Sequence, residues 1–204
     1  MADQRTDEWM AERIGKVTAS RVFAILDTTA KGAPTAARLA LLKEIVVERL
    51  TGQRKDVFIN KAMQRGVDLE PVARTEYEMR HGVMVIETDF VPHPTVDNVG
   101  ASPDGLVGDD GLIEIKCPET WNHLEVMQTG EIPPQYIAQM QLQMECTGRG
   151  WCDFVSYDDR LPEHLAYFER RVEYDRDYVA AMMDKVALFL AEVDEIIGGL
   201  PRES

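Results

Sequence analysis

Residues 100–119, GASPDGLVGDDGLIEIKCPE, constrain the fold of this 204-residue chain more than any other segment. The stretch GLIEIKCP, residues 111–118, lies between a glycine and a proline and predicts a short β-strand. Successive side chains of a strand point to opposite faces. The two sets are Leu112, Glu114 and Lys116, and Ile113, Ile115 and Cys117. We expect the second set to enter the core, so that a glutamate and a lysine project together from a strand buried on its reverse side.

A Pro-Asp-Gly turn lies ten residues before Glu114 and can bring Asp104 beside the strand. Two carboxylates suit a hard cation such as Mg²⁺, and the backbone carbonyl of Ile115 can supply a third oxygen. Lys116 would stand next to the water at such a site, and the cation would keep the pKa of the lysine down. These groups are the ones that phosphodiester hydrolysis requires. The alternative is an ordinary Glu-x-Lys ion pair on a solvent-facing strand, with Asp104 in a surface turn.

Glu70 is a further candidate. If residues 61–80 form a helix, Glu70 projects with the apolar stripe of that helix, and a buried carboxylate needs a partner. One partner is Arg74, four residues on, and the other is a metal shared with Asp104 and Glu114.

Three glutamines recur at every fourth position after Pro134 and form a polar stripe on a predicted helix: Gln135, Gln139 and Gln143. Most such stripes face water. Of the three, Gln139 is the candidate to donate to a phosphate or to water at the metal site.

The rest of the chain alternates between helical and strand patterns. Helices are predicted over 19–26, 33–52, 60–82, 133–148 and 175–199. Thr18 or Ser20 would cap the first, and Pro71 would kink or break the third. Strands broken by turns are predicted over 83–91 and 96–108, and further strands over 111–118, 150–158 and 164–174. This order predicts an α/β fold, a central mixed β-sheet flanked by helices. We expect one domain over residues 1–204, with a helical part to about residue 58 and a core over about 59–200.

The net charge of −14 is unevenly distributed. Residues 1–65 hold 12 Lys and Arg against 8 Asp and Glu, whereas residues 66–204 hold 10 against 28. A basic front part is compatible with a DNA partner, and equally with a solvated face.

The cysteines and histidines exclude several kinds of site. The three cysteines have no CxxC spacing, which argues against a disulfide framework or a zinc knuckle and predicts reduced, mostly buried thiols. The four histidines have no metal-ligand spacing and are expected at the surface or in caps. No apolar run reaches the roughly 20 residues of a membrane span, and residues 1–13 lack the apolar core of a signal peptide. We therefore expect a cytoplasmic protein without a membrane partner.

The sequence resembles the PD-(D/E)xK nucleases, and among them the lambda exonuclease-like viral recombination exonucleases. Five blocks in order carry the resemblance over most of the chain: RIGKVTAS (13–20), NKAMQRGVDLEPVAR (60–74), ASPDGLVGDDGLIEIKCPE (101–119), QYIAQMQLQM (135–144) and WCDFVSYDDR (151–160). The resemblance implies a restriction-endonuclease-like core and digestion of one strand of duplex DNA from its 5′ end, which leaves a 3′ single-stranded tail. It also implies Mg²⁺ as cofactor, with Mn²⁺ as a substitute and two ions per site.

The resemblance assigns roles to particular positions. Asp104, Glu114, the Ile115 carbonyl and Glu70 would hold metal, while Lys116 would activate water and Gln139 would help to place it. Arg13 matches the family arginine that meets the terminal 5′ phosphate, with Ser20 and Ser102 as polar neighbours. Lys61 and Met63 fall where the family inserts residues near the point of strand separation. Tyr136 would lie near the site. For Met63 and Tyr136, core packing is the alternative.

The partners that the resemblance implies are double-stranded DNA ends, two further copies of the chain in a ring-shaped homotrimer, and a single-strand annealing protein, in a phage or prophage function. Two other functions stay open. One is a PD-(D/E)xK endonuclease, because the same site recurs on this fold with different substrates. The other is a DNA-end-binding module that does not cleave, which Lys116 disfavours because a binding module needs no lysine beside the carboxylates.

Overall fold

The computed structural model describes residues 7–54 and 60–201. The ends of the expected domain and the expected boundary near residue 58 lie outside the described residues. The helices are α1 (Asp7–Glu12), α2 (Phe23–Leu26), α3 (Ala36–Thr51), α4 (Lys61–His81), α5 (Thr120–Thr129), α6 (Pro134–Thr147) and α7 (Arg176–Gly198), with 3-10 turns η1 (Ala19–Arg21) and η2 (Glu163–Leu165). The strands are β1 (Val17–Thr18), β2 (Val85–Ile86), β3 (Val91–Pro92), β4 (Val99–Ala101), β5 (Gly105–Val107), β6 (Gly111–Lys116), β7 (Trp151–Tyr157) and β8 (Tyr167–Glu173).

The strands form two mixed sheets where the sequence predicts one. The larger has the order β2-β5-β6-β7-β8, in which only β6 and β7 run parallel. The smaller has the order β1-β4-β3, in which β1 and β4 run parallel. The mixed α/β class is confirmed. Residues 102–104 carry the chain from β4 of the small sheet into β5 of the large one, so the Pro-Asp-Gly turn lies at the junction of the sheets.

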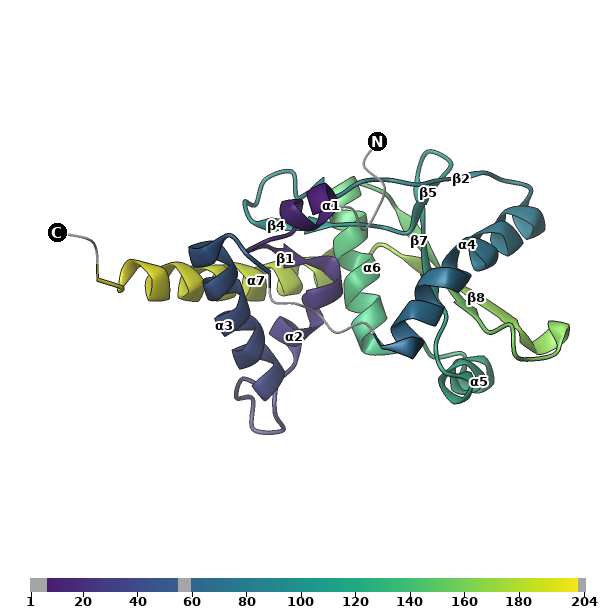
Figure 1. Cartoon of the computed structure of the whole chain (residues 1–204), viewed down its shortest axis with the longest axis horizontal. Coiled ribbons are helices and arrows are strands. Elements are labelled where there is room, and N and C mark those ends of the chain that lie inside the picture. Colours follow the sequence, from purple (N-terminus) through teal and green to yellow (C-terminus); the bar gives the residue numbers. More distant parts are fainter. Residues whose placement is uncertain (1–6, 55–59, 202–204) are drawn as a thin grey trace.

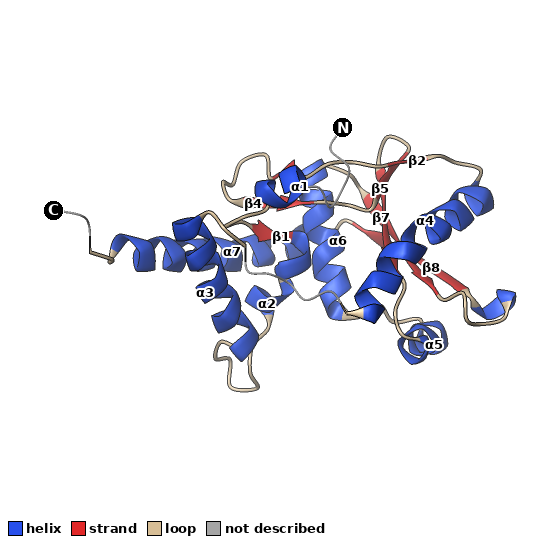
Figure 2. Cartoon of the chain, viewed as in Figure 1, coloured by secondary structure: helices blue, strands red, loops and turns tan. Residues whose placement is uncertain are grey.

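Helices cover both faces of the large sheet. Ala73 and Tyr77 of α4 pack on one face together with Ile113 and Ile115 of β6. On the other face, residues of α5 and α6 pack against both central strands: Val126, Met140 and Met144 meet Leu112, Cys152 and Phe154. Figures 1 and 2 show strands β2, β5, β7 and β8 of the large sheet toward one end of the molecule, where α4 and α5 also lie.

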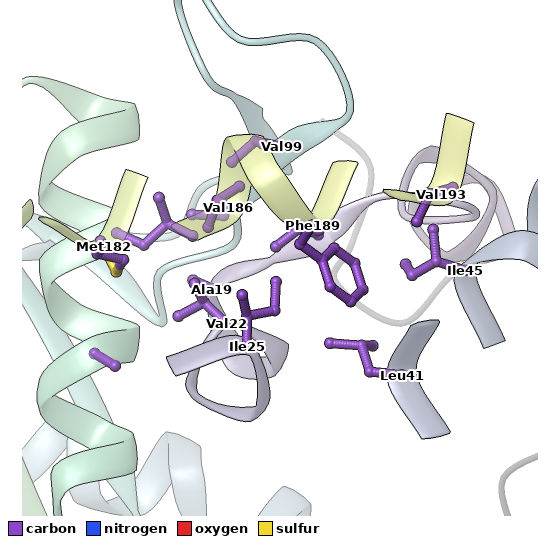
Figure 3. Packing of buried hydrophobic residues seen from close by; sticks show 14 of the residues in the cluster. Ala19, Val22, Ile25, Leu41, Ile45, Val99, Met182, Val186, Phe189 and Val193 are labelled. Atoms are coloured by element: carbon purple, nitrogen blue, oxygen red, sulfur yellow. The ribbon is translucent and has the colours of Figure 1, made fainter. Parts of the chain in front are cut away.

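The opposite end of the molecule is a helical layer made of α2, α3 and α7 (Figure 1). The apolar residues at helical spacing along α7 form the face that packs: Met182, Val186, Phe189 and Val193 are buried, and Tyr178 and Ile197 are partly buried. Figure 3 shows this face against Ile25, Leu41 and Ile45, with Val99 of β4 beside it. Each fully buried side chain of this size contributes about 1.5–3 kcal/mol to folding.

Helix α6 is enclosed between these two layers. Its Ala138 and Leu142 belong to the helical layer, whereas Met140 and Met144 belong to the cluster on the large sheet. The glutamine stripe of α6 therefore does not simply face water, and Gln143 is completely buried.

Several predicted helix ends are confirmed. The Thr35 side chain accepts from Arg38 N–H and caps α3, which ends at Gly52 with a left-handed backbone. Asn60 caps α4 in the same way. A break at Pro71 is wrong, since α4 continues through it and is held by packing on the sheet.

Two other expectations for helices fail. Neither Thr18 nor Ser20 supplies a side-chain cap to residues 19–26, because the two hydroxyls lie 3.3 Å from each other and the segment divides into η1 and α2. Helix α5 was not predicted. Helix α5 buries Val126 and His123, and His123 is fully buried.

The thiols follow the prediction and the histidines follow it in part. All three cysteines are free, and burial raises the pKa of Cys146 to about 12. His93 caps a turn, since its Nδ1 accepts from the N–H groups of Thr95 and Val96, but it is buried. His123 is neither at the surface nor in a cap, because its ring bonds Ser156 Oγ at 2.7 Å and the Leu165 carbonyl at 2.8 Å. Across residues 7–54 and 60–201, no helix has the length and apolarity to cross a membrane.

Candidate active site

A cavity of about 230 Å³ lies beside the junction of the two sheets. Nine residues predicted for the site line it: Arg13, Ser20, Glu70, Ser102, Asp104, Glu114, Ile115, Lys116 and Gln139. They come from α4, α6, β6, the N-terminal segment and the turn between the sheets. Trp9 and Ala19 complete the lining and were not predicted.

Strand pairing places Asp104 next to Glu114. Strands β5 and β6 are antiparallel with Gly105 opposite Ile113, so the residue before Gly105 meets the one after Ile113. The Asp104 carboxylate is fixed there because its Oδ2 accepts from the Ile115 N–H at 2.7 Å. The turn thus brings the two carboxylates together, and the alternative of a separate surface turn is wrong.

The face of β6 that carries Glu114 is buried as well as the reverse face that was expected to enter the core. Helix α6 covers it, and both Leu112 and Glu114 have no exposed surface. Gln139 Nε2 lies 2.6 Å from Glu114 Oε1, and Gln143 Nε2 lies 2.6 Å from Glu114 Oε2. The Lys116 ammonium pairs with Oε1 as well. Gln143 was not predicted as a site residue, and its only signal in the sequence is its position four residues after Gln139.

The charges of the cavity perturb one another. Burial and then the charge of Glu114 raise the pKa of Asp104 well above its usual range. For Lys116, burial alone would lower the pKa, but Glu114 and Asp104 outweigh it and the pKa is raised. The protein's own groups therefore keep Lys116 protonated, and the expected lowering depends on the charge of a bound cation.

Of the two partners considered for Glu70, Arg74 is present in the structure, and Glu70 also lies at the same cavity as the other two carboxylates. Arg74 Nη2 donates to Glu70 Oε1 at 3.0 Å, which is the helical pair, and Glu70 also lines the cavity with Asp104 and Glu114. The same Arg74 nitrogen donates to the Asp104 carbonyl at 3.2 Å. Arg74 therefore ties α4 to the turn and holds the third carboxylate at the cavity.

Arg13 also lines the cavity. Its Nη1 donates to Ser102 Oγ at 2.8 Å, its Nη2 lies 3.3 Å from Ser20 Oγ, and its guanidinium lies 4.3 Å from the centroid of the Trp9 ring. Burial, then the charges of Arg54 and Arg21, lower the pKa of Arg13 to about 10, so it is still a cation at neutral pH. A buried cation among neutral hydroxyls suits an anionic ligand.

The donor set fits a hard divalent cation. Within the described part of the chain, no three Asp, Glu, His or Cys side chains are already arranged as a metal cage. Asp104 in the turn before β5 and Glu114 on β6 nevertheless present carboxylate oxygens beside each other, and their mutual repulsion is what a cation would relieve. Lys116 and Gln139 now share Glu114 Oε1, the oxygen that such a cation would compete for.

The remaining predicted residues lie outside this cavity. Lys61 and Met63 are on the exposed first turn of α4, and Met63 is 45% exposed, so core packing is wrong for it. Tyr136 lines an adjoining groove of about 420 Å³ that meets the cavity at Lys116. Its ring stacks on Phe154 at 5.7 Å and lies 5.0 Å from the Lys116 ammonium, so it both packs and neighbours the site.

The protein has an α/β fold, and its cavity is lined by paired carboxylates, a lysine and a buried arginine. Residues 8–150 match the YqaJ-like viral recombinase domain, and the chain belongs to this family. It is similar to an alkaline exonuclease (LHK-Exo) from Laribacter hongkongensis, with 52% identity, a TM-score of 0.88 and 95% of each chain covered. The structure of LHK-Exo in complex with dAMP gives 51% identity and a TM-score of 0.89, again with 95% of each chain covered.

Two more distant relatives extend the comparison. A phage related exonuclease from Haemophilus somnus 129PT has 18% identity and a TM-score of 0.71, over 93% of this chain and 98% of that one, which shows a shared fold. The uncharacterized protein R354 of Acanthamoeba polyphaga mimivirus is 24% identical over 169 residues. That match covers 75% of this chain but only 29% of R354, so the chain spans less than a third of this relative.

Proposed function

We propose that this chain is a Mg²⁺-dependent exonuclease that digests one strand of linear double-stranded DNA from a 5′-phosphorylated end. The product would be duplex DNA with a 3′ single-stranded tail for single-strand annealing recombination. Similarity to LHK-Exo, described as an alkaline exonuclease, supports the nuclease class. The observation that carries the proposal is that Asp104, Glu114, Lys116 and Arg13 line one cavity.

Asp104, Glu114 and the Ile115 carbonyl would hold the cation, Mg²⁺ or in its place Mn²⁺, and Glu70 would complete a site for two ions. When bound, the cation would supply positive charge that stabilises the attacked phosphate and lowers the pKa of water. Lys116 would activate the attacking water by stabilising it as hydroxide, and Gln139 would help to place that water through its amide.

Arg13 is the reason for proposing that digestion starts at the 5′ end. Ser102, which accepts from Arg13, is two residues from Asp104, so the anion pocket and the carboxylates are fixed relative to each other. A strand whose terminal phosphate meets Arg13, Ser20 and Ser102 would present the next phosphodiester to the carboxylates. Attack of water on that phosphorus, with the 3′ oxygen as leaving group, releases a 5′-mononucleotide and leaves a new 5′ phosphate.

The test is digestion of linear duplexes that carry a 5′ phosphate or a 5′ hydroxyl, in Mg²⁺ or EDTA. Wild type should remove the phosphorylated strand only with metal, and Lys116→Ala should lower that rate by at least about 100-fold while it still binds ends. Nicking of closed circles with intact linear ends would favour the endonuclease instead. Binding without any cleavage would favour the end-binding module.

We further propose that three copies form a ring around DNA and act beside a single-strand annealing protein. An acidic exterior around a basic channel would reconcile the net charge of −14 with a polyanionic substrate. Light scattering should give three times the chain mass of 23.1 kDa. A monomeric mass would contradict the ring.

A further inference from the structure

Gln143 holds one oxygen of Glu114, and Gln139 and Lys116 hold the other. Gln143 lies on α6 one turn after Gln139, has no exposed surface, and donates from Nε2 to Glu114 Oε2 at 2.6 Å. The other oxygen, Oε1, receives both Gln139 Nε2 and the Lys116 ammonium. The two oxygens of this carboxylate therefore have different surroundings.

The difference follows the geometry of the cavity. Gln139 and Lys116 line it, whereas Gln143 does not. Oε1 is thus the oxygen on the cavity side, and Oε2 is the oxygen held from within the protein. Gln143 is buried between the sheet and the helical layer. Water therefore cannot replace Glu114 as the hydrogen-bond acceptor of its amide.

The rest of the Gln143 amide supports a role toward Glu114. Within the described part of the chain, its Oε1 is buried without a hydrogen-bond partner, which is an unusual cost for a core side chain. Its Nε2 also lies 3.5 Å from the Ser102 carbonyl, and the Ser102 hydroxyl accepts from Arg13. The donor end of the amide, and not the acceptor end, is the part that the structure uses.

We propose that Gln143 is a positioning residue for metal binding: it fixes Glu114 through Oε2, so that Oε1 alone is presented to the cation. The inference rests on the metal-dependent function proposed above. Carboxylates that bind metals are themselves hydrogen-bonded, and loss of such a partner weakens metal affinity or activity by about 10–100-fold. Gln139 cannot replace Gln143, since it contacts the other oxygen.

The experiment measures Mn²⁺ binding to the metal-stripped full chain by electron paramagnetic resonance, without DNA. Gln143→Met keeps the length of the side chain and removes the donor, and its Kd for Mn²⁺ should rise by about 10–100-fold. Gln141→Met is the matched control. Gln141 is buried on the same helix and makes two hydrogen bonds, to the Glu173 carbonyl at 2.8 Å and from the Asp175 N–H at 2.9 Å, but it does not line the cavity. Because Gln141→Met loses hydrogen bonds in the core but leaves the lining of the cavity unchanged, it should keep the wild-type Kd for Mn²⁺.

A wild-type Kd for Gln143→Met would overturn the inference, as would an equal rise in Gln141→Met. If Gln143→Met does not fold, Gln143→Asn takes its place, because its amide is one methylene shorter and cannot reach Oε2. An unchanged Kd in that variant overturns the inference too. Glu114→Gln separates the two proposals: if it binds Mn²⁺ as wild type does, or if wild type binds none, the proposed metal site falls and the role of Gln143 falls with it.

Discussion

At Asp104, burial and the charge of Glu114 raise the pKa of the carboxyl well above its usual value of 3.8. The unfolded chain releases this proton near that usual value. Between the two pKa values the folded state therefore holds more protons than the unfolded state, and its stability falls as the pH rises. The carboxylate that is proposed to bind metal thus destabilises the metal-free fold at neutral pH, as active-site groups often do.

Replacing Asp104 with Asn should stabilise the metal-free protein. The amide oxygen can still accept from Ile115 N–H, but no charge remains beside Glu114. In EDTA, the Tm of Asp104→Asn should equal that of wild type near pH 4 and exceed it increasingly toward pH 8, by about 2–4 °C for each kcal/mol. Thermal unfolding across this range checks it.

Added Mg²⁺ serves as the control, since it should raise the Tm of wild type and not that of the variant. A variant that melts below wild type at every pH would show that the Asp104 charge stabilises the fold.

The residues of the candidate site differ in how far the sequence predicts them. Alternation along 111–118 and the Pro-Asp-Gly turn place Asp104, Glu114 and Lys116 together, because strand geometry and turn chemistry are local. Gln143 could not be found in this way. The sequence shows a polar stripe, and only the position of α6 between two layers decides which glutamine is buried against Glu114.

Among the elements, α3 fixes the segment that carries Arg13. Glu48 of α3 is 1% exposed, accepts from the Gly15 N–H at 2.8 Å and receives two nitrogens of Arg21 at 3.2 Å. Gly15 has a φ of +70°, and a Cβ there would lie 2.7 Å from Arg49 Cγ. The loop before β1 can therefore adopt this path only with glycine at that position and the carboxylate beneath it.

Loss of Glu48 should be costly. Glu48→Ala leaves the Arg21 charge and the Gly15 N–H without their buried partner, and it should lower the free energy of unfolding by about 3–5 kcal/mol. The matched control is Glu44→Ala, since Glu44 also pairs with Arg21, at 2.8 Å, but has 37% of its side chain exposed. That change should cost less than about 1 kcal/mol. Urea unfolding measures both, and equal losses would mean that burial of Glu48 does not set its contribution.

Local sequence signals predict most of the helices and strands. They do not predict which strands pair across long stretches of the sequence. Asn60, Gly52 and Gly148 mark helix ends that the structure confirms. Helix α5 has no side-chain cap at Glu119, and its buried side includes His123, so its short apolar pattern is not recognisable. The division into two sheets depends on β1 pairing with β4, which is distant in sequence, and no local pattern specifies that pairing.

At the scale of the whole molecule, the acidic charge limits where DNA can dock. The chain carries a net charge of −14, and at the cavity the cations that face a substrate are Arg13 and Lys116. We therefore expect binding to duplex ends to depend on few phosphate contacts, with a shallow fall of log K against log salt concentration.

Arg13→Gln should reduce the magnitude of that salt slope by about 1 and abolish the preference for a 5′ phosphate over a 5′ hydroxyl. Fluorescence anisotropy of labelled linear duplexes in EDTA measures both effects without cleavage. Lys185→Gln removes one positive charge from the exposed side of α7, outside the residues that line the cavity, and should change neither quantity. Equal effects of the two substitutions would show that net charge, and not the pocket formed by Arg13, Ser20 and Ser102, governs recognition of DNA ends. An effect confined to Arg13 would tie end recognition to the cavity that holds the carboxylates, because Ser102 and Asp104 belong to the same turn.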